Sequence, residues 1–189
     1  MSETLVYENQ TFSDLSSIDT KPASYENCIF SHCQFLQQDL RQNQFSDVKF
    51  ESCRINLCSM TNCQLRGVIF IDCQLVGVDF SQIDQLIVDI NFRSCQLDSC
   101  NFSGLDLPKT SFRGCKLANC DFVSTRLLGA DFRQVEFSNT VFHQADLRQA
   151  DFRHALNYQL NPLSNQIKKA KFSTPEVINL LADLQIEIS

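Results

Sequence analysis

The feature that most constrains the fold of this chain is a repeat of five residues. Large apolar residues recur at every fifth position from Tyr25 to Phe80 and again from Phe92 to Phe152, and fourteen of the sixteen Phe lie on this register. A period of five matches neither a helix, at 3.6, nor a strand, at 2. It fits a chain that turns a corner every five residues, so that four sides close a coil of about twenty residues.

The other positions of the repeat agree with such a coil. Two residues before each large residue stands a small or compact one, and the remaining three positions are mainly Asp, Asn, Gln, Ser, Arg and Gly. One large and one small side chain therefore point inward on each side, and three polar ones point outward. Stacked coils hydrogen-bond through their backbones at about 4.8 Å. The sequence predicts an all-β solenoid with four faces.

The individual repeat units also resemble those of a known family. "CDFVS", "ADFRQ", "ADLRQ" and "ADFRH" are similar to the A(D/N)Lxx unit of the pentapeptide-repeat proteins, and the resemblance covers residues 23–156. It implies a right-handed quadrilateral β-helix.

Breaks in the register divide the chain into segments. Tyr7 and Phe12 share a phase that does not continue smoothly into Tyr25, and Phe80 to Phe92 is two residues longer than two repeats. The break after Phe80 is either a register correction or a small recognition loop. The predicted segments are an irregular N-terminal coil (1–22), a first repeat block (23–80), a register break or small loop (81–91), a second block (92–156) and a C-terminal cap (157–189).

All ten cysteines occupy the small inward position of the repeat. Spacings of five and ten differ from the C-x-x-C pairs of zinc sites, and the three His fall at outward positions. The position predicts free, buried, structural thiols; disulfides and a metal site are the alternatives, and no metal or cofactor is expected. The cysteines are Cys28, Cys33, Cys53, Cys58, Cys63, Cys73, Cys95, Cys100, Cys115 and Cys120.

The C-terminal segment has the signature of a short α-helix. Ser173 or Thr174 can serve as N-cap, Pro175 suits the first turn, and an apolar stripe follows. The stripe consists of Val177, Leu180, Leu181 and Leu184. A solenoid end exposes unpaired backbone and core, so the stripe caps it. Capping alone and capping with dimerisation are both open at this point.

A column of arginines is predicted on the outside of the rod. Each of the four follows a Phe and they recur every twenty residues, while Asp131 and Asp151 precede two of the same Phe residues. The column is either a surface ladder of ion pairs, each of small effect, or a site for an anionic partner. Its members are Arg93, Arg113, Arg133 and Arg153.

No pattern in the chain is typical of catalysis: no Gly-rich phosphate loop is present, and Ser and Asp recur on every face as part of the repeat. An enzyme is therefore not expected. The tail, with "KKAKFSTPEV" and "LLADLQIEI", resembles that of the Qnr/MfpA-type quinolone-resistance proteins. This resemblance implies a homodimer joined end to end through the C-terminal segment. It also implies binding to DNA gyrase or topoisomerase IV by mimicry of duplex DNA, with resistance to quinolones or topoisomerase toxins.

Charge supports DNA mimicry only in part. The chain carries a formal net charge of −6. Six stacked coils span about 30 Å, and duplex DNA, at about one charge per 1.7 Å, carries on the order of eighteen charges over that length. Without a signal-like start or an apolar run of about 18 residues, a cytoplasmic protein with no membrane contact is expected. Direct nucleic-acid binding is not expected. A scaffold or adaptor with an unrelated protein partner is the alternative function.

Overall fold

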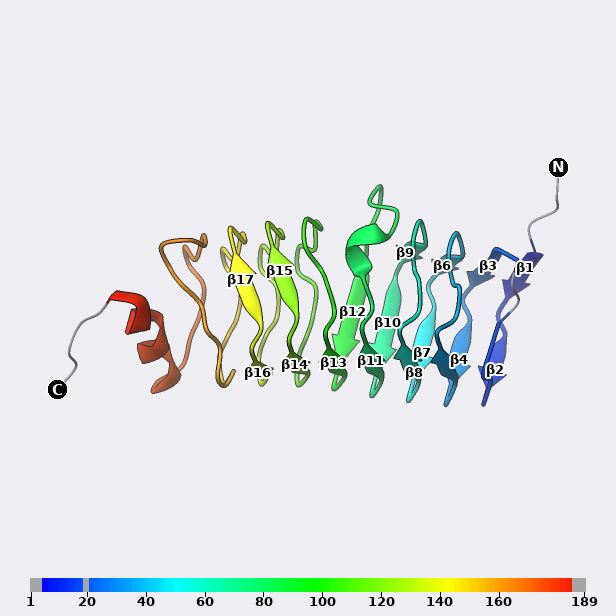
Figure 1. The fold of residues 1–189 in the computed structure, drawn as a ribbon, viewed down its shortest axis with the longest axis horizontal. Helices are drawn as coiled ribbons and strands as arrows, with labels where there is room; N and C mark the ends of the chain where they lie inside the picture. Colours follow the sequence, from blue (N-terminus) through cyan, green and yellow to red (C-terminus); the bar gives the residue numbers. More distant parts are fainter. Residues whose placement is uncertain (1–4, 19–20, 185–189) are drawn as a thin grey trace.

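The computed structural model describes the backbone of residues 5–18 and 21–184 and the side chains up to residue 181. The molecule is an elongated rod whose strands run across its long axis and stack along it, with the two ends of the chain at opposite ends of the rod (Figure 1). Four parallel ladders form its four faces. The predicted fold class, a quadrilateral β-helix, is confirmed. No described helix is long and apolar enough to cross a membrane.

The four faces follow one another around each coil and are named in that order. Face 1 consists of β1 (Leu5–Glu8), β3 (Ala23–Glu26), β6 (Gln44–Ser46) and β9 (Gln64–Arg66) and continues through the isolated bridges of Asp106, Arg126, Asp146 and Gln166. Face 2 consists of β2 (Thr11–Ser13), β4 (Ile29–Ser31), β7 (Lys49–Glu51), β10 (Val68–Ile71) and β12 (Ile90–Arg93) and continues through the bridges of Ser111, Asp131, Asp151 and Lys171.

The other two faces complete the coil. Face 3 consists of β5 (Gln34–Leu36), β8 (Arg54–Asn56), β11 (Gln74–Val76), β13 (Gln96–Asp98), β14 (Lys116–Ala118) and β16 (Glu136–Ser138). Face 4 consists of β15 (Asp121–Val123) and β17 (Val141–His143), preceded by the bridges of Asp39, Ser59, Asp79 and Asn101. Within a regular coil each residue pairs with the residue twenty positions away, as Phe50 does with Phe70.

The core of face 2 is a continuous stack of nine phenyl rings with neighbouring centroids 4.8–5.3 Å apart. The rings are Phe12, Phe30, Phe50, Phe70, Phe92, Phe112, Phe132, Phe152 and Phe172. Phe12 and Phe172, the two Phe outside the five-residue register, form the two ends of this stack. Offset stacking of this kind adds to the free energy gained by burying the rings.

The breaks in the register are absorbed without loss of alignment between coils. Tyr7 pairs with Tyr25 and Phe12 with Phe30, so the first coil is two residues short but keeps its place in the ladders. The ladders also extend beyond residue 156 to Lys171. Between these points Tyr158 and Leu160, both buried, fill the core out of phase with the repeat.

Within the predicted break at 81–91, residues 83–89 form a loop that replaces a strand of face 1 and is followed directly by β12. The 3-10 helix η1 (Phe80–Gln82) precedes it. The Asp84 N–H donates to the carbonyl of Cys63, just before β9, at 2.9 Å, and the Asp89 N–H donates to the carbonyl of Leu65, within β9, at 3.0 Å. These two hydrogen bonds fix both ends of the loop over face 1. Between them the chain projects from the rod (Figure 1), and the Leu86 side chain is 85% exposed.

The C-terminal cap is a 3-10 helix, η2 (Glu176–Leu184), and the α-helix predicted here was wrong in type. The expected capping interaction is replaced, because the Ser173 hydroxyl accepts a hydrogen bond from the backbone N–H of His154 (3.2 Å). The Ile178 N–H then donates to the Pro175 carbonyl (3.1 Å), the three-residue step of a 3-10 turn. Leu180 is buried, Val177 packs on the core and Leu181 is 37% exposed. The side chain of Leu184 lies outside the described residues.

The ten cysteines all point inward and are buried, and none is bonded to another. Their thiols donate to backbone carbonyls, for example from Cys63 to Leu40 (2.7 Å) and from Cys53 to Phe30 (3.3 Å), so the buried S–H groups have partners. Burial raises the pKa of the Cys63 thiol to about 12. The Cys63 thiol is therefore protonated at neutral pH and a poor nucleophile.

Candidate functional site: two oppositely charged halves of one surface

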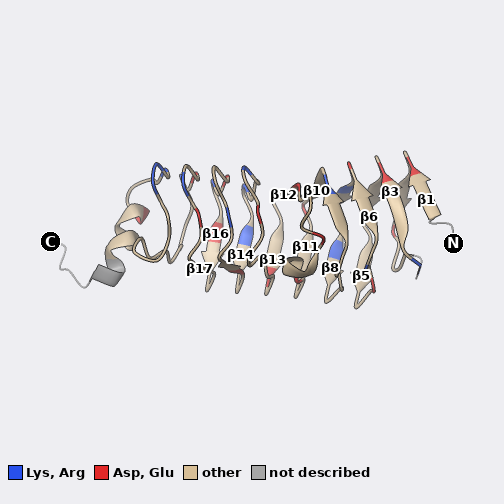
Figure 2. Ribbon diagram, turned by 90° about the horizontal axis from the view of Figure 1, so that it is seen from above, with Lys and Arg blue, Asp and Glu red and all other residues tan. Residues whose placement is uncertain are grey.

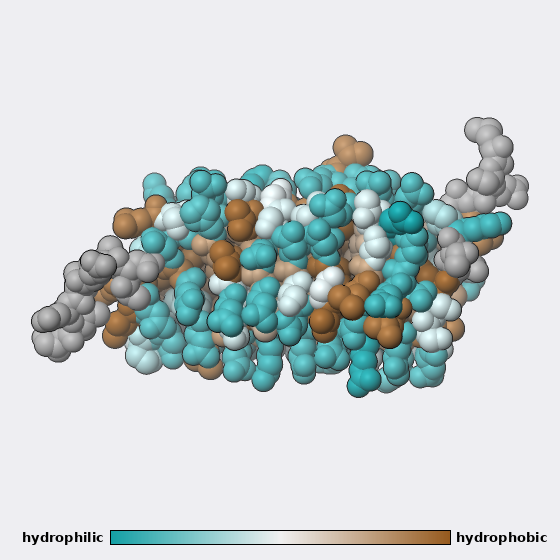
Figure 3. All heavy atoms as spheres, in the orientation of Figure 1, coloured by the Kyte–Doolittle hydropathy of each residue, from teal (hydrophilic) through white to brown (hydrophobic). Residues whose placement is uncertain are grey.

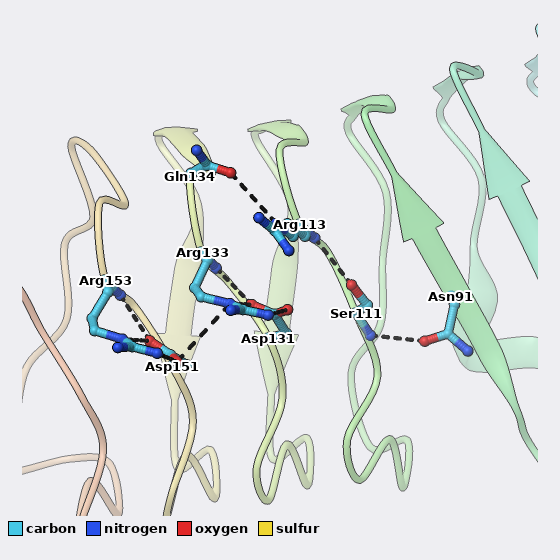
Figure 4. Close-up of polar contacts among 8 residues, drawn as sticks. All are labelled: Asn91, Ser111, Arg113, Asp131, Arg133, Gln134, Asp151 and Arg153. Carbon is cyan, nitrogen blue, oxygen red and sulfur yellow. Dashed lines mark hydrogen bonds and ion pairs between the residues drawn. The ribbon is translucent and has the colours of Figure 1, made fainter.

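The four arginines of the predicted column stand in successive coils of face 2. Each backbone N–H at the corner of one coil donates to the arginine carbonyl of the next: Ser94 to Arg113, Gly114 to Arg133 and Gln134 to Arg153. Because residues on either side of an inward Phe point outward, the residue before the Phe lies beside the arginine after it. The identity of that preceding residue decides what each arginine does (Figure 4).

Arg133 and Arg153 are clamped by the aspartates that precede their Phe. Arg133 donates to Asp131 through Nε (2.8 Å) and through its terminal nitrogen (2.7 Å), and Arg153 makes the same two contacts with Asp151 (2.9 and 2.7 Å). The hydrogen bonds from Arg153 lower the pKa of Asp151. Burial alone would raise the pKa of Asp131, but the hydrogen bonds from Arg133 outweigh it and lower that pKa. These two arginines are neutralised in place.

Arg93 and Arg113 have no such carboxylate. Asn91 and Ser111 stand where the aspartates stand in later coils, and they bond to backbone: Ser111 N–H donates to the Asn91 side chain (2.9 Å), and Arg113 N–H donates to the Ser111 hydroxyl (3.3 Å). Among the described residues, the Arg113 guanidinium donates a hydrogen bond only to the side-chain carbonyl oxygen of Gln134, at 3.4 Å. Both arginines are exposed, so the column divides into two paired and two available cations.

The same division extends over faces 1 and 2 from residue 90 to residue 173, here called the basic half. It carries ten Lys and Arg against four Asp. Each of the four Asp is in an ion pair with an arginine of the same half: Asp106 with Arg126, Asp131 with Arg133, Asp146 with Arg148 and Asp151 with Arg153. The six cations that make no ion pair among the described residues are Arg93, Lys109, Arg113, Lys168, Lys169 and Lys171, of which Lys171 lies close enough to Asp151 to lower the pKa of that carboxyl.

Faces 1 and 2 from residue 5 to residue 89 have the opposite character and are here called the acidic half. Their bases are Lys49 and Arg66, and none of their described acids or bases is in an ion pair. The acids are Glu8, Asp14, Glu26, Asp47, Glu51, Asp72, Asp84 and Asp89. The acidic half therefore has a net charge of −6 and the basic half of +6.

The remaining faces carry few charges. In the repeats of faces 3 and 4 that precede the loop, the charges cancel, with two acids (Asp39, Asp79) and two bases (Arg41, Arg54). After the loop these faces have a net charge of −2, with three acids (Asp98, Asp121, Glu136) and one base (Lys116). Figure 2 shows the contrast along one edge of the rod: acidic residues mark the tips of β1 and β3, and basic residues mark the same edge toward the C-terminus. The charge of the molecule is thus concentrated on one pair of faces.

Sequence reasoning found the arginine column but missed the two charged halves. Sums over consecutive segments combine all four faces, so that residues 91–160 appear nearly neutral. The signal was present in the register itself, because each residue's place in the twenty-residue coil assigns it to a face. The missed Lys168, Lys169 and Lys171 follow the break at 157–164, after which the register resumes at Ile167 and Phe172.

A groove of about 850 Å³ lies between the last coil and the cap. Val141, His143, Tyr158 and Leu160 are among its lining residues. The Tyr158 hydroxyl is buried without a described hydrogen-bond partner, and burial raises the pKa of this group to about 12. Among the described residues, no group of three or more His, Cys, Asp or Glu side chains is placed to hold a metal ion.

Comparison with known proteins agrees with this architecture. Two structures of QnrB1, described as a plasmid-mediated fluoroquinolone resistance protein, match over nearly the whole of both chains. For one, the TM-score is 0.64 at 18% identity, with 98% of each chain covered. For the other, it is 0.54 at 17% identity, with 99% of this chain and 100% of that chain covered. At this identity the likeness shows the fold.

A search of curated proteins found no similar sequence. The family model described as "Pentapeptide repeat region" matches residues 23–98 and 90–172, which together are most of the chain. The chain belongs to the pentapeptide-repeat family.

Proposed function

We propose that this protein is a non-enzymatic binding protein that acts in the cytoplasm on a type II topoisomerase, DNA gyrase or topoisomerase IV. The observation that carries the proposal is the acidic half. Enzymes that hold duplex DNA neutralise its phosphates with Lys and Arg. A rigid rod with exposed, unpaired carboxylates on two adjacent faces is complementary to such a surface.

The charge density of the acidic half is closer to that of DNA than the whole chain suggests. Its net charge of −6 is spread over five coils, about 20 Å at the inter-strand spacing. This is about one charge per 3 Å, on the order of half the density of the duplex, at one per 1.7 Å. The likeness of the fold to QnrB1, described as a fluoroquinolone resistance protein, supports the same class of partner and a role in resistance to quinolones or topoisomerase toxins.

Charge reversal in the acidic half tests the proposal. Glu8 and Glu26 are exposed cross-strand neighbours on β1 and β3. In the Glu8→Lys/Glu26→Lys variant we expect the concentration that half-inhibits gyrase supercoiling to rise about tenfold or more, because the variant repels a basic groove. The assay is run with and without ciprofloxacin, so that inhibition and protection from the drug are both measured.

The matched control reverses the same number of charges elsewhere. Asp98→Lys/Asp121→Lys changes faces 3 and 4 and should leave the activity near that of the unmodified protein. Equal losses in both variants would show that only total charge matters. If the unmodified protein has no effect on gyrase or topoisomerase IV at micromolar concentration, the proposal fails and a scaffold or adaptor role is favoured.

We further propose that two copies join end to end through the cap. Leu181 and Ile178 are 37% and 47% exposed on η2, beside the groove of the last coil, and a second cap would cover them. The Leu181→Glu variant is expected to shift the protein to monomer at micromolar concentration, because a buried, unpaired charge is costly. Light scattering after size exclusion measures the mass. Thr61→Glu, on an outward position of face 4, is the control, and a variant that stays dimeric with an unchanged dissociation constant would refute the contact.

A further inference from the structure

We propose that faces 1 and 2 form a second interface, through which two copies of this chain pair side by side and antiparallel, with the acidic half of each copy on the basic half of the other. This contact is separate from the end-to-end contact of the caps. It follows from the placement of charge along the rod and from the position of the loop at 83–89.

The surface is complementary to itself. The two halves lie on the same pair of faces and carry −6 and +6, while the other faces carry little charge. A two-fold axis perpendicular to the rod, passing through the loop at 83–89, places the coils before the loop of each copy on the coils after the loop of the other. Such an axis is the usual symmetry of protein dimers, in which one patch meets its own copy.

The rows of face 1 place the centre of this symmetry. Four strands, β1, β3, β6 and β9, precede the loop, and four rows follow it, marked by the bridged residues Asp106, Arg126, Asp146 and Gln166. The loop is therefore the middle row of nine. An axis through it brings the first row onto the last, so that Glu8 of one copy lies opposite the Lys168 and Lys169 row of the other. On face 2, Asp14 then lies toward the Lys171 row.

The centre of the interface is apolar. Leu86 and Ile87 of the loop are 85% and 56% exposed, and Figure 3 shows an apolar group projecting from the rod at the place of this loop in Figure 1. The axis brings the two loops together, where these side chains bury one another, while Asp84 and Asp89 of each loop lie against the other loop and not against a basic half. This contact matters because exposed ion pairs contribute little each; the charges set the orientation and the loops add burial.

A second copy fits this surface better than a nucleic acid does. A duplex lying along the rod would gain contacts with the six unpaired cations of the basic half. It would then meet the eight acids of the acidic half on the same two faces within about 20 Å, and be repelled there. Only a partner whose charge also changes sign at the middle of the rod is complementary to the whole surface, and this chain is such a partner.

The test measures mass, shape and salt dependence together. Sedimentation velocity and small-angle scattering are recorded at 20 mM and 500 mM NaCl. At low salt we expect an assembly about twice as thick as the species present at high salt and of the same length as that species. At high salt we expect the dissociation constant to rise at least tenfold, because exposed charges are screened. An end-to-end dimer instead doubles the length, and apolar contacts of the caps persist in high salt.

A charge swap identifies the surface. Lys168→Glu/Lys169→Glu and Glu8→Lys/Glu26→Lys should each abolish the thick assembly alone, and a 1:1 mixture of the two variants should restore it. Arg54→Glu/Lys116→Glu, which changes face 3, is the control and should behave as the unmodified protein. Leu86→Asn/Ile87→Asn should weaken the assembly severalfold without changing the fold.

Three results would overturn the inference. The first is a protein that remains one rod thick at low salt and at 100 μM. The second is a mixture of the two charge variants that does not associate. The third is a single-rod protein that binds a labelled 24-base-pair duplex through the basic half, with binding lost in Lys168→Glu/Lys169→Glu; this would assign that half to nucleic acid.

Discussion

Replacing Phe112 by alanine is expected to lower the free energy of unfolding by about 4 kcal/mol, the range of large-to-small changes in well-packed cores. Phe112 is the sixth of the nine stacked rings and is fully buried. It stacks on Phe92 and Phe132, both at 5.1 Å, and meets Phe102 and Phe122 edge to face at 5.6 and 5.5 Å. Since each coil contacts only its neighbours, a cavity here weakens both interfaces of one coil.

Two comparisons separate this effect from a general intolerance of the core. Phe112→Leu should cost about 1 kcal/mol, because leucine fills the same position in other repeats, as at Leu107 and Leu117. Phe172→Ala should also cost less, because this partly exposed ring ends the stack: Phe152 stacks on one side of it and Tyr158 is tilted against it, with no further described ring beyond. Urea unfolding followed by circular dichroism measures all three variants. Equal losses at Phe112 and Phe172 would contradict the ring stack as the source of stability.

Alkaline pH is expected to destabilise the protein steeply. Burial raises the pKa of Cys63 to about 12, and contact with the Cys115 thiol together with burial raises that of Cys95 to about 12, against an ordinary value of 9.0. Between pH 9 and about pH 12 the two thiols lose their protons in the unfolded chain and keep them in the folded chain, so raising the pH in this range favours unfolding. Each thiol contributes a slope of about 1.4 kcal/mol per pH unit, and the two together about 3 kcal/mol per pH unit. Below pH 9 their contribution to stability is fully present and constant.

Valine substitution provides the control for the alkaline effect. Valine occupies the same inward position at Val48, Val68, Val78 and Val135, so Cys63→Val/Cys95→Val should fold at neutral pH. The double variant should lose about 3 kcal/mol less stability per pH unit between pH 9.5 and 11. Urea midpoints in the presence of a phosphine reductant, at several pH values, give both slopes. Identical slopes in the two proteins would show that these thiols are not responsible.

The sequence predicted the fold well because the repeat is a direct record of geometry. A large residue at every fifth position is possible only if the chain turns at that interval, and the cysteines confirm the inward slot by being buried. Two details were beyond this reasoning. The segment Glu176–Leu184 is a 3-10 helix, and the Ser173 hydroxyl, expected to cap an α-helix, instead accepts a hydrogen bond from the His154 N–H in the preceding coil. The continuation of the ladders to Lys171 follows a stretch in which Tyr158 fills the core out of phase with the repeat.

The candidate surface was predictable only in part. The column of Arg93, Arg113, Arg133 and Arg153 follows from the twenty-residue spacing, and Asp131 and Asp151 lie where that spacing places them. Which arginines stay available depends on single residues, Asn91 and Ser111, in the positions of those aspartates. The two charged halves required a face assignment through the short first coil and the irregular last one, and no local pattern supplies it.

The shared register of the four faces also restricts how such a chain can change length. An insertion or deletion of five residues would rotate everything after it by a quarter turn, so that the cations of faces 1 and 2 would move around the rod while the carboxylates before them stayed in place. Only an insertion or deletion of a whole coil keeps the acidic half and the basic half on the same two faces. The first coil, two residues short, and the coil with the loop, two residues long, keep that line because their odd residues are taken up in irregular segments. Variation in length is therefore compatible with this surface in steps of about twenty residues, or at those two segments.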